Sequence, residues 1–348
     1  MKNIDNARLL ITGASGFIGT NAMDLALEAG MEVVNFDIRP PRKPSHHKYW
    51  IYVDIRDKDE LLKAVQGFNP THILHLAAMT GMDIDNLQYF SANTDGVRNL
   101  IESTFAAPNL RKTLFTSSLL VCRNGYLPKN DSDYCPPNLY GESKVIGEQL
   151  VRSSTINGKW AIVRPTSVWG PWFEHSYLTF FKMVDRGLYL HPGKAAIFKP
   201  LSFVGNTVYM MSKLLFSDLD SSHQETFYLA DYPEHSIQEW GDMIQRNLGA
   251  RRVPTVPITI LKVVAGIGDL CKKFGWRDPP LTSFRLENML MGGHYPIEKI
   301  QKIAGSLPFS MEEGVRRTIQ WMHEHRQIRR AMAEIESRPQ NFGHPDKW

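Results

Sequence analysis

The segment that most constrains the fold of this chain is Thr12–Gly19, which reads TGASGFIG and follows a short apolar run. Its glycines, Gly13, Gly16 and Gly19, recur at every third position where a strand is expected to turn into a helix. The first permits the tight turn, the second lets a pyrophosphate approach the backbone, and the third lets the helix pack closely on the strand. The helix N-terminus then offers free N–H groups and the positive end of its dipole. This arrangement predicts a dinucleotide site of the Rossmann type.

Strand-like and helix-like segments alternate over residues 8–165. Helical spacing of apolar residues marks Leu61–Val65 and Val97–Thr104. Such alternation predicts βαβ crossovers and a parallel sheet. Runs such as LLIT and HILHL are apolar on both faces, as central parallel strands are. The six expected strands are Arg8–Thr12, Glu32–Asp37, Trp50–Val53, His72–Leu76, Lys112–Ser117 and Trp160–Arg164.

The pattern changes after about residue 166, where prolines and aromatics become frequent. We expect an α/β protein with a doubly wound Rossmann-type parallel sheet and a smaller C-terminal substrate-binding part. Residues 1–165 form the dinucleotide-binding part with the catalytic residues. Residues 166–330 form most of the substrate-binding part, with some segments returning to the sheet and a final helix at about Met311–His325. Residues 331–348 are expected to be a poorly ordered polar tail.

Composition and charge narrow the class of protein. The 348 residues are 43% hydrophobic and carry a formal net charge of only +4, with no basic run of the kind that nucleic-acid binders show. The three cysteines and the histidines have no metal-ligand spacing, so we expect no metal. The stretch Ile258–Leu270, interrupted by Lys262, is too short to span a bilayer. With no signal peptide at the N-terminus, we expect a cytoplasmic protein with a small-molecule substrate and no membrane partner.

Asp37 ends the second expected strand, at about the distance from the glycine loop where a carboxylate accepts hydrogen bonds from the adenosine ribose. A carboxylate there repels a 2′-phosphate and favours NAD. Arg39, Arg42 and Lys43 follow closely and keep NADP open as an alternative. Asp54 is expected either to accept the adenine amino group or to cap a helix over Lys58–Val65.

The fourth expected strand ends in HLAA at residues 75–78. Small side chains at the carboxyl end of a strand leave room for a cofactor in the crevice. We interpret His75 as a packed core histidine rather than a catalyst.

Tyr140 and Lys144 lie four residues apart, after Pro136-Pro137-Asn138, where Asn138 can cap a helix. On a helix the two side chains share one face, and the ammonium is expected to lower the phenol pKa from about 10 toward working pH. Such a tyrosine can take the proton of a substrate hydroxyl as hydride leaves its carbon.

Ser118, at the end of the fifth strand, is expected to hold the substrate oxygen beside Tyr140, with Ser117 as the neighbouring candidate. The sequence has no G-x-S-x-G elbow, which argues against a nucleophilic serine.

These motifs together resemble the extended short-chain dehydrogenase/reductase family, the NAD-dependent epimerase/dehydratase group. The resemblance is carried by TGASGFIG at 12–19, Asp37, DIRD at 54–57, HLAA at 75–78, NTDGVRNL at 93–100, TSS at 116–118, YGESK at 140–144 and RPTSVWGP at 164–171. It implies catalytic roles for Tyr140 and Lys144, assistance by Ser118, a place for Asn93 near the cofactor, and a homodimer.

From the motifs and the resemblance together we expect a defined set of cofactor contacts. They are Gly13, Ser15, Gly16, Phe17, Ile18, Gly19, Asp37, Arg39, Asp54, Ile55, Leu76, Ala77, Ala78, Asn93, Tyr140, Lys144, Pro165 and Ser167.

The chain also departs from the family pattern. Sugar-nucleotide dehydratases place Asp-Glu after the catalytic Thr, where this chain has Leu119-Leu120, and leucines cannot transfer protons. Ser167 and Lys199 stand where epimerases usually carry Asn and Arg to hold the nucleotide diphosphate, and Asn206 stands where an Asp is common. Arg285 is a candidate diphosphate ligand, with a surface or intrachain contact as its alternative. We expect Ser118, Ser167, Lys199 and Arg285 to contact the substrate.

Three functions remain open from the sequence. The leading one is an epimerase of a nucleoside-diphosphate sugar that works through a transient keto intermediate. The second is a reductase or dehydrogenase of a hydrophobic alcohol, of the 3β-hydroxysteroid or flavonol type. Aromatic residues that suit such a pocket are Trp169, Trp172, Phe173, Tyr177, Phe180 and Phe181. The third is a non-catalytic NAD(P)-binding protein, which the intact Ser-Tyr-Lys set disfavours.

Overall fold

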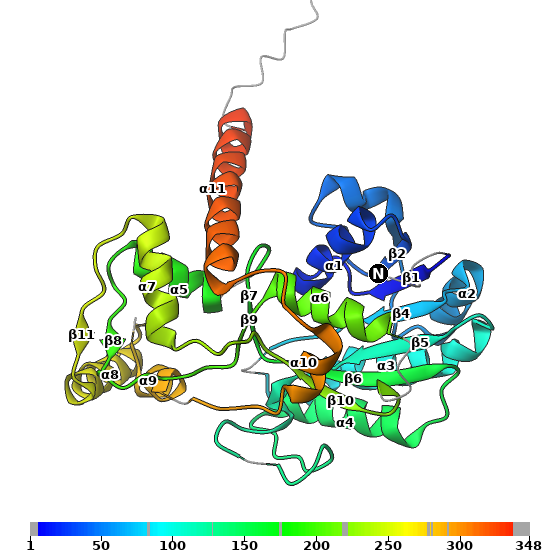
Figure 1. Cartoon of the computed structure of the whole chain (residues 1–348), viewed down its shortest axis with the longest axis horizontal. Coiled ribbons are helices and arrows are strands. Elements are labelled where there is room, and N and C mark those ends of the chain that lie inside the picture. The colour runs from blue at the N-terminus through cyan, green and yellow to red at the C-terminus, as the bar shows by residue number, and fades with distance from the viewer. Residues whose placement is uncertain are drawn as a thin grey trace, which may run out of the picture.

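The computed structural model describes residues 6–81, 84–126, 128–173, 176–217, 222–276, 279, 281–290 and 292–336. Its centre is a seven-stranded sheet in the order β10-β6-β5-β4-β1-β2-β3, in which every neighbouring pair is parallel (Figure 1). The strands are β1 Arg8–Thr12, β2 Glu32–Asp37, β3 Trp50–Tyr52, β4 His72–His75, β5 Lys112–Thr116, β6 Lys159–Pro165 and β10 Thr226–Leu229.

Helices join the strands and cover the sheet (Figure 1). Those of the N-terminal half are α1 Phe17–Glu28, α2 Lys58–Phe68, α3 Ser91–Ser103 and α4 Leu139–Ser153, with short 3-10 helices η1 Pro44–Tyr49, η2 Leu87–Phe90, η3 Thr104–Ala106 and η4 Leu119–Val121. The helices α3 and α4 pack against each other, and α6, Val204–Leu215, lies against α1.

The expected doubly wound fold and its six strands are confirmed, each to within one residue at either end. The seventh strand, β10, comes from the C-terminal half and pairs with β6 through Thr226–Leu229. It is one of the segments expected to return to the sheet, although its position was not predicted. β10 is four residues long and fully buried, so its hydrophobic pattern alone cannot distinguish it from a short piece of helix.

The strand order reverses between β1 and β4, and this reversal opens a crevice at the carboxyl ends of the strands. Gly13 has φ of +75°, and a Cβ added there would lie 2.5 Å from the Ala77 nitrogen. A Cβ on Gly19 would collide with the Ala14 backbone. The glycines therefore have the roles expected from the sequence, because side chains at either position would push the loop off its neighbours.

The C-terminal half builds a second unit beside the sheet (Figure 1). It consists of α5 Ser176–Asp185, α7 Ile237–Leu248, α8 Ile258–Lys273, α9 Ser283–Leu290 and the short strand pairs β7 Ser167–Trp169 with β9 Leu201–Phe203 and β8 His191–Pro192 with β11 Thr255–Val256. Trp169 and Trp240 lie in its core with their ring centroids 5.3 Å apart. The helix α10, Glu298–Ala304, returns to pack on α6 and β10.

The terminal helix α11 runs over Met311–Glu336 and is longer than expected (Figure 1). The first residues of the expected tail, 331–336, are thus helical, and residues 337–348 lie outside the described residues. Among the helices of the described part, none is long and apolar enough to cross a membrane.

Candidate active site

Asp37 is held rigidly at the end of β2. The Ser15 amide donates to its Oδ2 at 3.0 Å, and the Arg39 amide donates to its Oδ1 at 2.9 Å. Asn35 donates to the Ser15 hydroxyl, which in turn donates to the Arg39 carbonyl. The carboxylate therefore lies against the glycine loop, where the ribose of a dinucleotide is expected.

Two of the three basic residues that kept NADP open are directed elsewhere. Arg42 donates from Nε to the Ser15 carbonyl at 3.0 Å and from Nη1 to the Trp172 carbonyl at 2.8 Å. The Lys43 ammonium lies 2.7 Å from Asp24 Oδ1. Arg39, which is exposed, contributes its backbone amide to Asp37.

Asp54 does not cap the following helix, so that alternative is wrong. The cap of α2 is Asp57, whose carboxylate accepts from the Glu60 amide. Asp54 instead accepts from Arg56 at both oxygens, and this pairing holds the pKa of Asp54 below its usual range. The side chain of Ile55 is buried in the core.

His75 is a buried core histidine, as expected. Its Nδ1 lies 2.7 Å from the Thr12 hydroxyl, which also accepts from the Ala77 amide at 3.3 Å. Burial lowers the pKa of His75 to about 3, so the ring is neutral.

Asn93 fastens the segment after β4 to helix α4. Its Oδ1 accepts from the Met79 amide, and its Nδ2 donates to the Met79 carbonyl and to Ser143 Oγ, all at 2.9 Å. The hydroxyl of Ser143 donates to the Tyr140 carbonyl at 2.7 Å. Asn93 thus sets the spacing between the crevice wall and the helix that bears Tyr140.

Tyr140 and Lys144 lie on one face of α4, and both are buried. Asn138 caps this helix as expected, because its side chain accepts from the Gly141 amide at 2.9 Å. The Tyr140 hydroxyl is hydrogen-bonded to Ser118, whose Oγ also accepts from the Leu120 amide. Lys144 Nζ donates to the Thr116 carbonyl at 3.0 Å. The structure therefore brings Ser118, Tyr140 and Lys144 to the carboxyl end of β5.

The structure favours Ser118 over Ser117 as the residue beside Tyr140. The Ser117 hydroxyl has no hydrogen-bond partner among the described residues, and Ser117 lines a cavity of about 20 Å³. Lys144, Asn93 and His75 also line this cavity, which has room for a single water.

The expectation that Lys144 lowers the pKa of Tyr140 does not hold in this structure. Burial raises the pKa of Tyr140, and the hydrogen bond from Ser118 opposes that rise. Burial also lowers the pKa of Lys144 to about 8, so the ammonium that was to stabilise the phenolate is itself weakened. Desolvation penalises both charged forms together, which sequence spacing does not reveal.

Sequence reasoning missed two residues that position Tyr140. A Cβ on Gly141 would collide with the Leu120 carbonyl oxygen, so the glycine lets η4 press directly on the first turn of α4. Ser143 connects Asn93 to that same turn. Both residues stand within YGESK, but only the contact partners reveal what they do.

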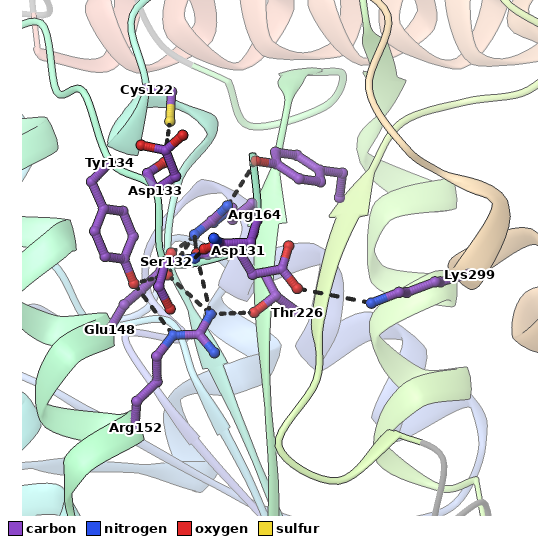
Figure 2. A network of polar contacts seen from close by, with 12 residues as sticks. Cys122, Asp131, Ser132, Asp133, Tyr134, Glu148, Arg152, Arg164, Thr226 and Lys299 are labelled. Carbon is purple, nitrogen blue, oxygen red and sulfur yellow. Dashed lines mark hydrogen bonds and ion pairs between the residues drawn. The ribbon is translucent and has the colours of Figure 1, made fainter. Parts of the chain in front are cut away.

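One turn beyond Lys144, helix α4 is tied to β6 by a buried ion pair (Figure 2). Arg164 donates to both oxygens of Glu148, at 2.8 and 2.7 Å, and to Tyr228 Oη at 2.7 Å. It also donates to the Asp131 carbonyl, while Tyr134 donates to Glu148. The network joins α4, β6, β10 and the 131–134 segment into one unit behind the site.

The residues expected to contact the substrate make different contacts within the protein. Ser167 is the first residue of β7 and is hydrogen-bonded to Tyr177. Pro165, two residues earlier, is buried. Burial lowers the pKa of Lys199 to about 8. Arg285 lies on α9, where its guanidinium donates to the Pro279 carbonyl. That contact fits the alternative, an intrachain role. No contact in the described part of the chain brings Arg285 together with Ser118.

Asn206 has a structural role. Its side chain donates to the Phe309 carbonyl and accepts from the Phe309 amide, which joins α6 to the segment before α11.

The aromatic residues considered for a hydrophobic pocket are mostly core. Trp169, Phe173 and Phe181 are at most 3% exposed. Phe180 stacks on Trp240, and Tyr177 packs edge-on against the same ring. These side chains pack in or against the hydrophobic core of the C-terminal unit.

Relatives of the chain include both epimerases and dehydrogenases. The N-acetyl-alpha-D-glucosaminyl-diphospho-ditrans,octacis-undecaprenol 4-epimerase of Escherichia coli O157:H7 is 24% identical over 92% of this chain and 96% of its own length. The 3-beta-hydroxysteroid dehydrogenase of Mycolicibacterium neoaurum is 26% identical over 89% of this chain and 90% of its own length.

Among solved structures, the UDP-glucose 4-epimerase of Thermus thermophilus in complex with NAD has a TM-score of 0.66 at 21% identity, covering 91% of this chain and 99% of that one. That likeness supports the fold. The profile of the family described as "NAD dependent epimerase/dehydratase family" matches residues 9–191, more than half of the chain. With the glycine loop, Asp37 and the α4 tyrosine–lysine pair in place, the chain belongs to the NAD-dependent epimerase/dehydratase family.

Proposed function

We propose that this protein is an NAD-dependent epimerase of a sugar carried on a diphosphate, with a nucleoside-diphosphate sugar as the leading substrate. The observation that carries the proposal is the hydrogen bond between Tyr140 and Ser118 beside Leu119-Leu120. It provides one acid/base group and one hydroxyl anchor for a substrate alcohol, and neither adjacent residue offers a second proton-transfer group.

The residues present fit NAD. NAD supplies a hydride acceptor and donor when it is bound. The glycine loop would hold its pyrophosphate, and Asp37 would accept from the ribose. The placement of Arg42 on the Ser15 and Trp172 carbonyls supports NAD over NADP, because that guanidinium is already engaged where a 2′-phosphate would need it.

In the proposed mechanism, Ser118 holds the substrate hydroxyl oxygen while Tyr140 Oη takes its proton. Lys144, on the same face of α4 as Tyr140, would hydrogen-bond the nicotinamide ribose. Tyr140 returns the proton after hydride has come back to the opposite face of the same carbon. The reaction is redox-neutral, and it needs no acid at the positions of Leu119 and Leu120.

Lys199 supports a diphosphate substrate. It stands where epimerases of the family usually carry the Arg that holds the nucleotide diphosphate, and lysine has the same charge. A nucleoside as the carrier of the sugar is suggested by the UDP-glucose 4-epimerase whose fold is similar. The Escherichia coli relative is named for a diphosphate-linked sugar whose carrier is a polyprenol. The assay should therefore include sugars linked through a diphosphate to a nucleoside and to a polyprenol.

The second candidate, a dehydrogenase of a hydrophobic alcohol, is favoured by the 3-beta-hydroxysteroid dehydrogenase relative. The aromatic residues argue against this candidate, because most of those considered for a hydrophobic substrate pocket are buried in the core. It uses the same Ser118, Tyr140 and Lys144 but releases a reduced or oxidised product.

The two candidates differ in the cofactor they retain. The protein is purified without added cofactor, denatured, and its released nucleotides are quantified. An epimerase keeps about one NAD per chain and converts diphosphate sugars with no cofactor added. An empty protein that turns over only with added NAD(P) and accumulates NAD(P)H or a ketone would overturn the proposal in favour of the dehydrogenase.

A further inference from the structure

Helix α8 has two apolar faces, and only one of them is packed. Leu261, Ala265 and Gly268 point inward, against a cluster that includes Leu286 of α9. A Cβ on Gly268 would collide with the Leu281 carbonyl, so α8 packs closely against the backbone that precedes α9. The inward face fully accounts for how the helix is held in the protein.

The opposite face of α8 is exposed and almost wholly hydrophobic. It carries Ile260, Val263, Val264, Ile267 and Leu270, which are 45% to 65% exposed and recur at helical spacing. Phe274 and Trp276 continue it past the end of the helix, at 84% and 54% exposed. These seven residues, the α8 apolar face, make up half of the fourteen large exposed hydrophobics among the described residues. A continuous patch of this kind indicates a binding surface.

The charges around the α8 apolar face are basic. Residues 251–276 contain five cations, Arg251, Arg252, Lys262, Lys272 and Lys273, all exposed. Asp269 is the only acidic residue in this range, and it accepts hydrogen bonds from the Ser283 amide on the packed side. The rim of the patch thus presents positive charge that no carboxylate of this segment offsets.

An apolar helix face with lysines at its edge and aromatic residues at its end matches an interfacial helix that lies in the plane of a bilayer. Lysine stems reach the headgroups, and the tryptophan ring prefers the same depth. The 16 residues of α8 extend about 24 Å, which suits a helix lying along the surface. A second copy of the chain fits the same face poorly, because a two-fold contact places one lysine rim against another.

We propose that the α8 apolar face docks the protein on an anionic membrane surface. The face belongs to the C-terminal unit, at the end of the molecule away from α2 and α3 (Figure 1). Docking therefore leaves the dinucleotide side free and brings the substrate-binding side to the lipid. From the sequence we expected no membrane partner, because no segment can span a bilayer. Surface docking needs no spanning segment, and this inference is independent of which substrate the enzyme takes.

The test uses the full chain and sedimentation with vesicles of phosphatidylcholine alone or mixed equally with phosphatidylglycerol. We expect binding to the mixed vesicles that weakens in high salt, because part of the attraction is ionic. Val263→Glu with Ile267→Glu is expected to lower the partition coefficient about tenfold or more, because two charges then face the acyl chains. Lys272→Glu with Lys273→Glu should lower binding to the anionic vesicles by about tenfold or more.

The matched control is Ile51→Glu with Phe105→Glu, which adds the same charge at hydrophobics 48% and 59% exposed elsewhere on the molecule. It should bind vesicles within about twofold of the unchanged chain. The proposal is overturned if the unchanged chain stays in solution with anionic vesicles, or if the control loses binding as strongly as the α8 variant. It is also overturned if sedimentation velocity shows that Val263→Glu with Ile267→Glu dissociates an oligomer of the unchanged chain, while vesicle binding is unchanged. Equal melting temperatures verify that the variants are folded.

Discussion

Arg164 and Glu148 form a buried ion pair with two hydrogen bonds, one helical turn from Lys144. Arg164 is fully buried and Glu148 is 3% exposed. Glu148 also raises the pKa of Lys144, opposing the lowering that burial causes. The pair thus has two effects: it fixes α4 on the sheet, and its carboxylate favours the charged form of Lys144.

Glu148→Gln separates these two effects. It leaves the Arg164 charge buried with a neutral partner, so we expect a loss of about 3–5 kcal/mol in the free energy of unfolding, measured by denaturant titration. Because the anion that raises the pKa of Lys144 is gone, the alkaline fall in kcat should move to lower pH. A variant that loses stability with an unchanged pH profile would show that Glu148 acts only as a structural support.

Tyr140→Phe removes the proton acceptor and keeps the ring. We expect kcat to fall about 100-fold or more, with the amount of bound NAD unchanged. Ser118→Ala should cost less, because Tyr140 can still take the proton from a less well-held substrate. Turnover that survives in Tyr140→Phe would show that another group moves the proton.

Gly141→Ala tests the contact that brings Ser118 to Tyr140. The added methyl meets the Leu120 backbone, so η4 must shift, and we expect lower kcat together with a stability loss of about 1–3 kcal/mol. Gly67→Ala is the matched control, because it lies within a helix with nothing near its added Cβ. That change should leave kcat unaltered and raise stability by about 0.5–1 kcal/mol.

Asp37→Asn should reduce the preference for NAD over NADP. The change removes the charge that repels a 2′-phosphate, so we expect about a tenfold change in the ratio of the two dissociation constants. Because the Asn amide has one acceptor oxygen, it can accept from only one of the Ser15 and Arg39 amides, and the affinity for both cofactors should fall together. Arg42→Ala should not weaken NADP selectively, because Arg42 is bound to two carbonyls of the chain. A selective loss of NADP affinity in that variant would identify Arg42 as a phosphate ligand.

Asp231 makes stability depend on pH. Burial raises its pKa from 3.8 to about 7, so the folded state keeps the proton over that range. Its contribution to the free energy of unfolding is therefore present below about pH 4 and is lost as the pH rises to 7. Asp231→Asn should become steadily more stable than the unchanged chain between those values, and Asp95→Asn, at an exposed carboxylate, should not. Parallel stability curves for the Asp231 variant and the unchanged chain would show that the acid is ionised when folded.

Local signals in the sequence were sufficient to predict six of the seven strands and the start of the helix that carries Tyr140 and Lys144. Short apolar runs between helix-like segments predicted the strands, and the three glycines predicted the loop after β1. Asn138 predicted the start of α4. The pKa of Tyr140 could not be predicted, since it depends on burial by residues distant in sequence. The α8 apolar face was also missed, because the hydrophobic pattern of α8 does not show which of its two apolar sides is packed.

The central claim is that hydride leaves the substrate carbon and returns to it within one catalytic cycle. The most direct measurement is turnover of a diphosphate sugar deuterated at the carbon that inverts, with no added cofactor. We predict that the inverted product keeps its deuterium and that no free NADH accumulates. Loss of the label to solvent, or its appearance in a cofactor released from the enzyme, would contradict the account.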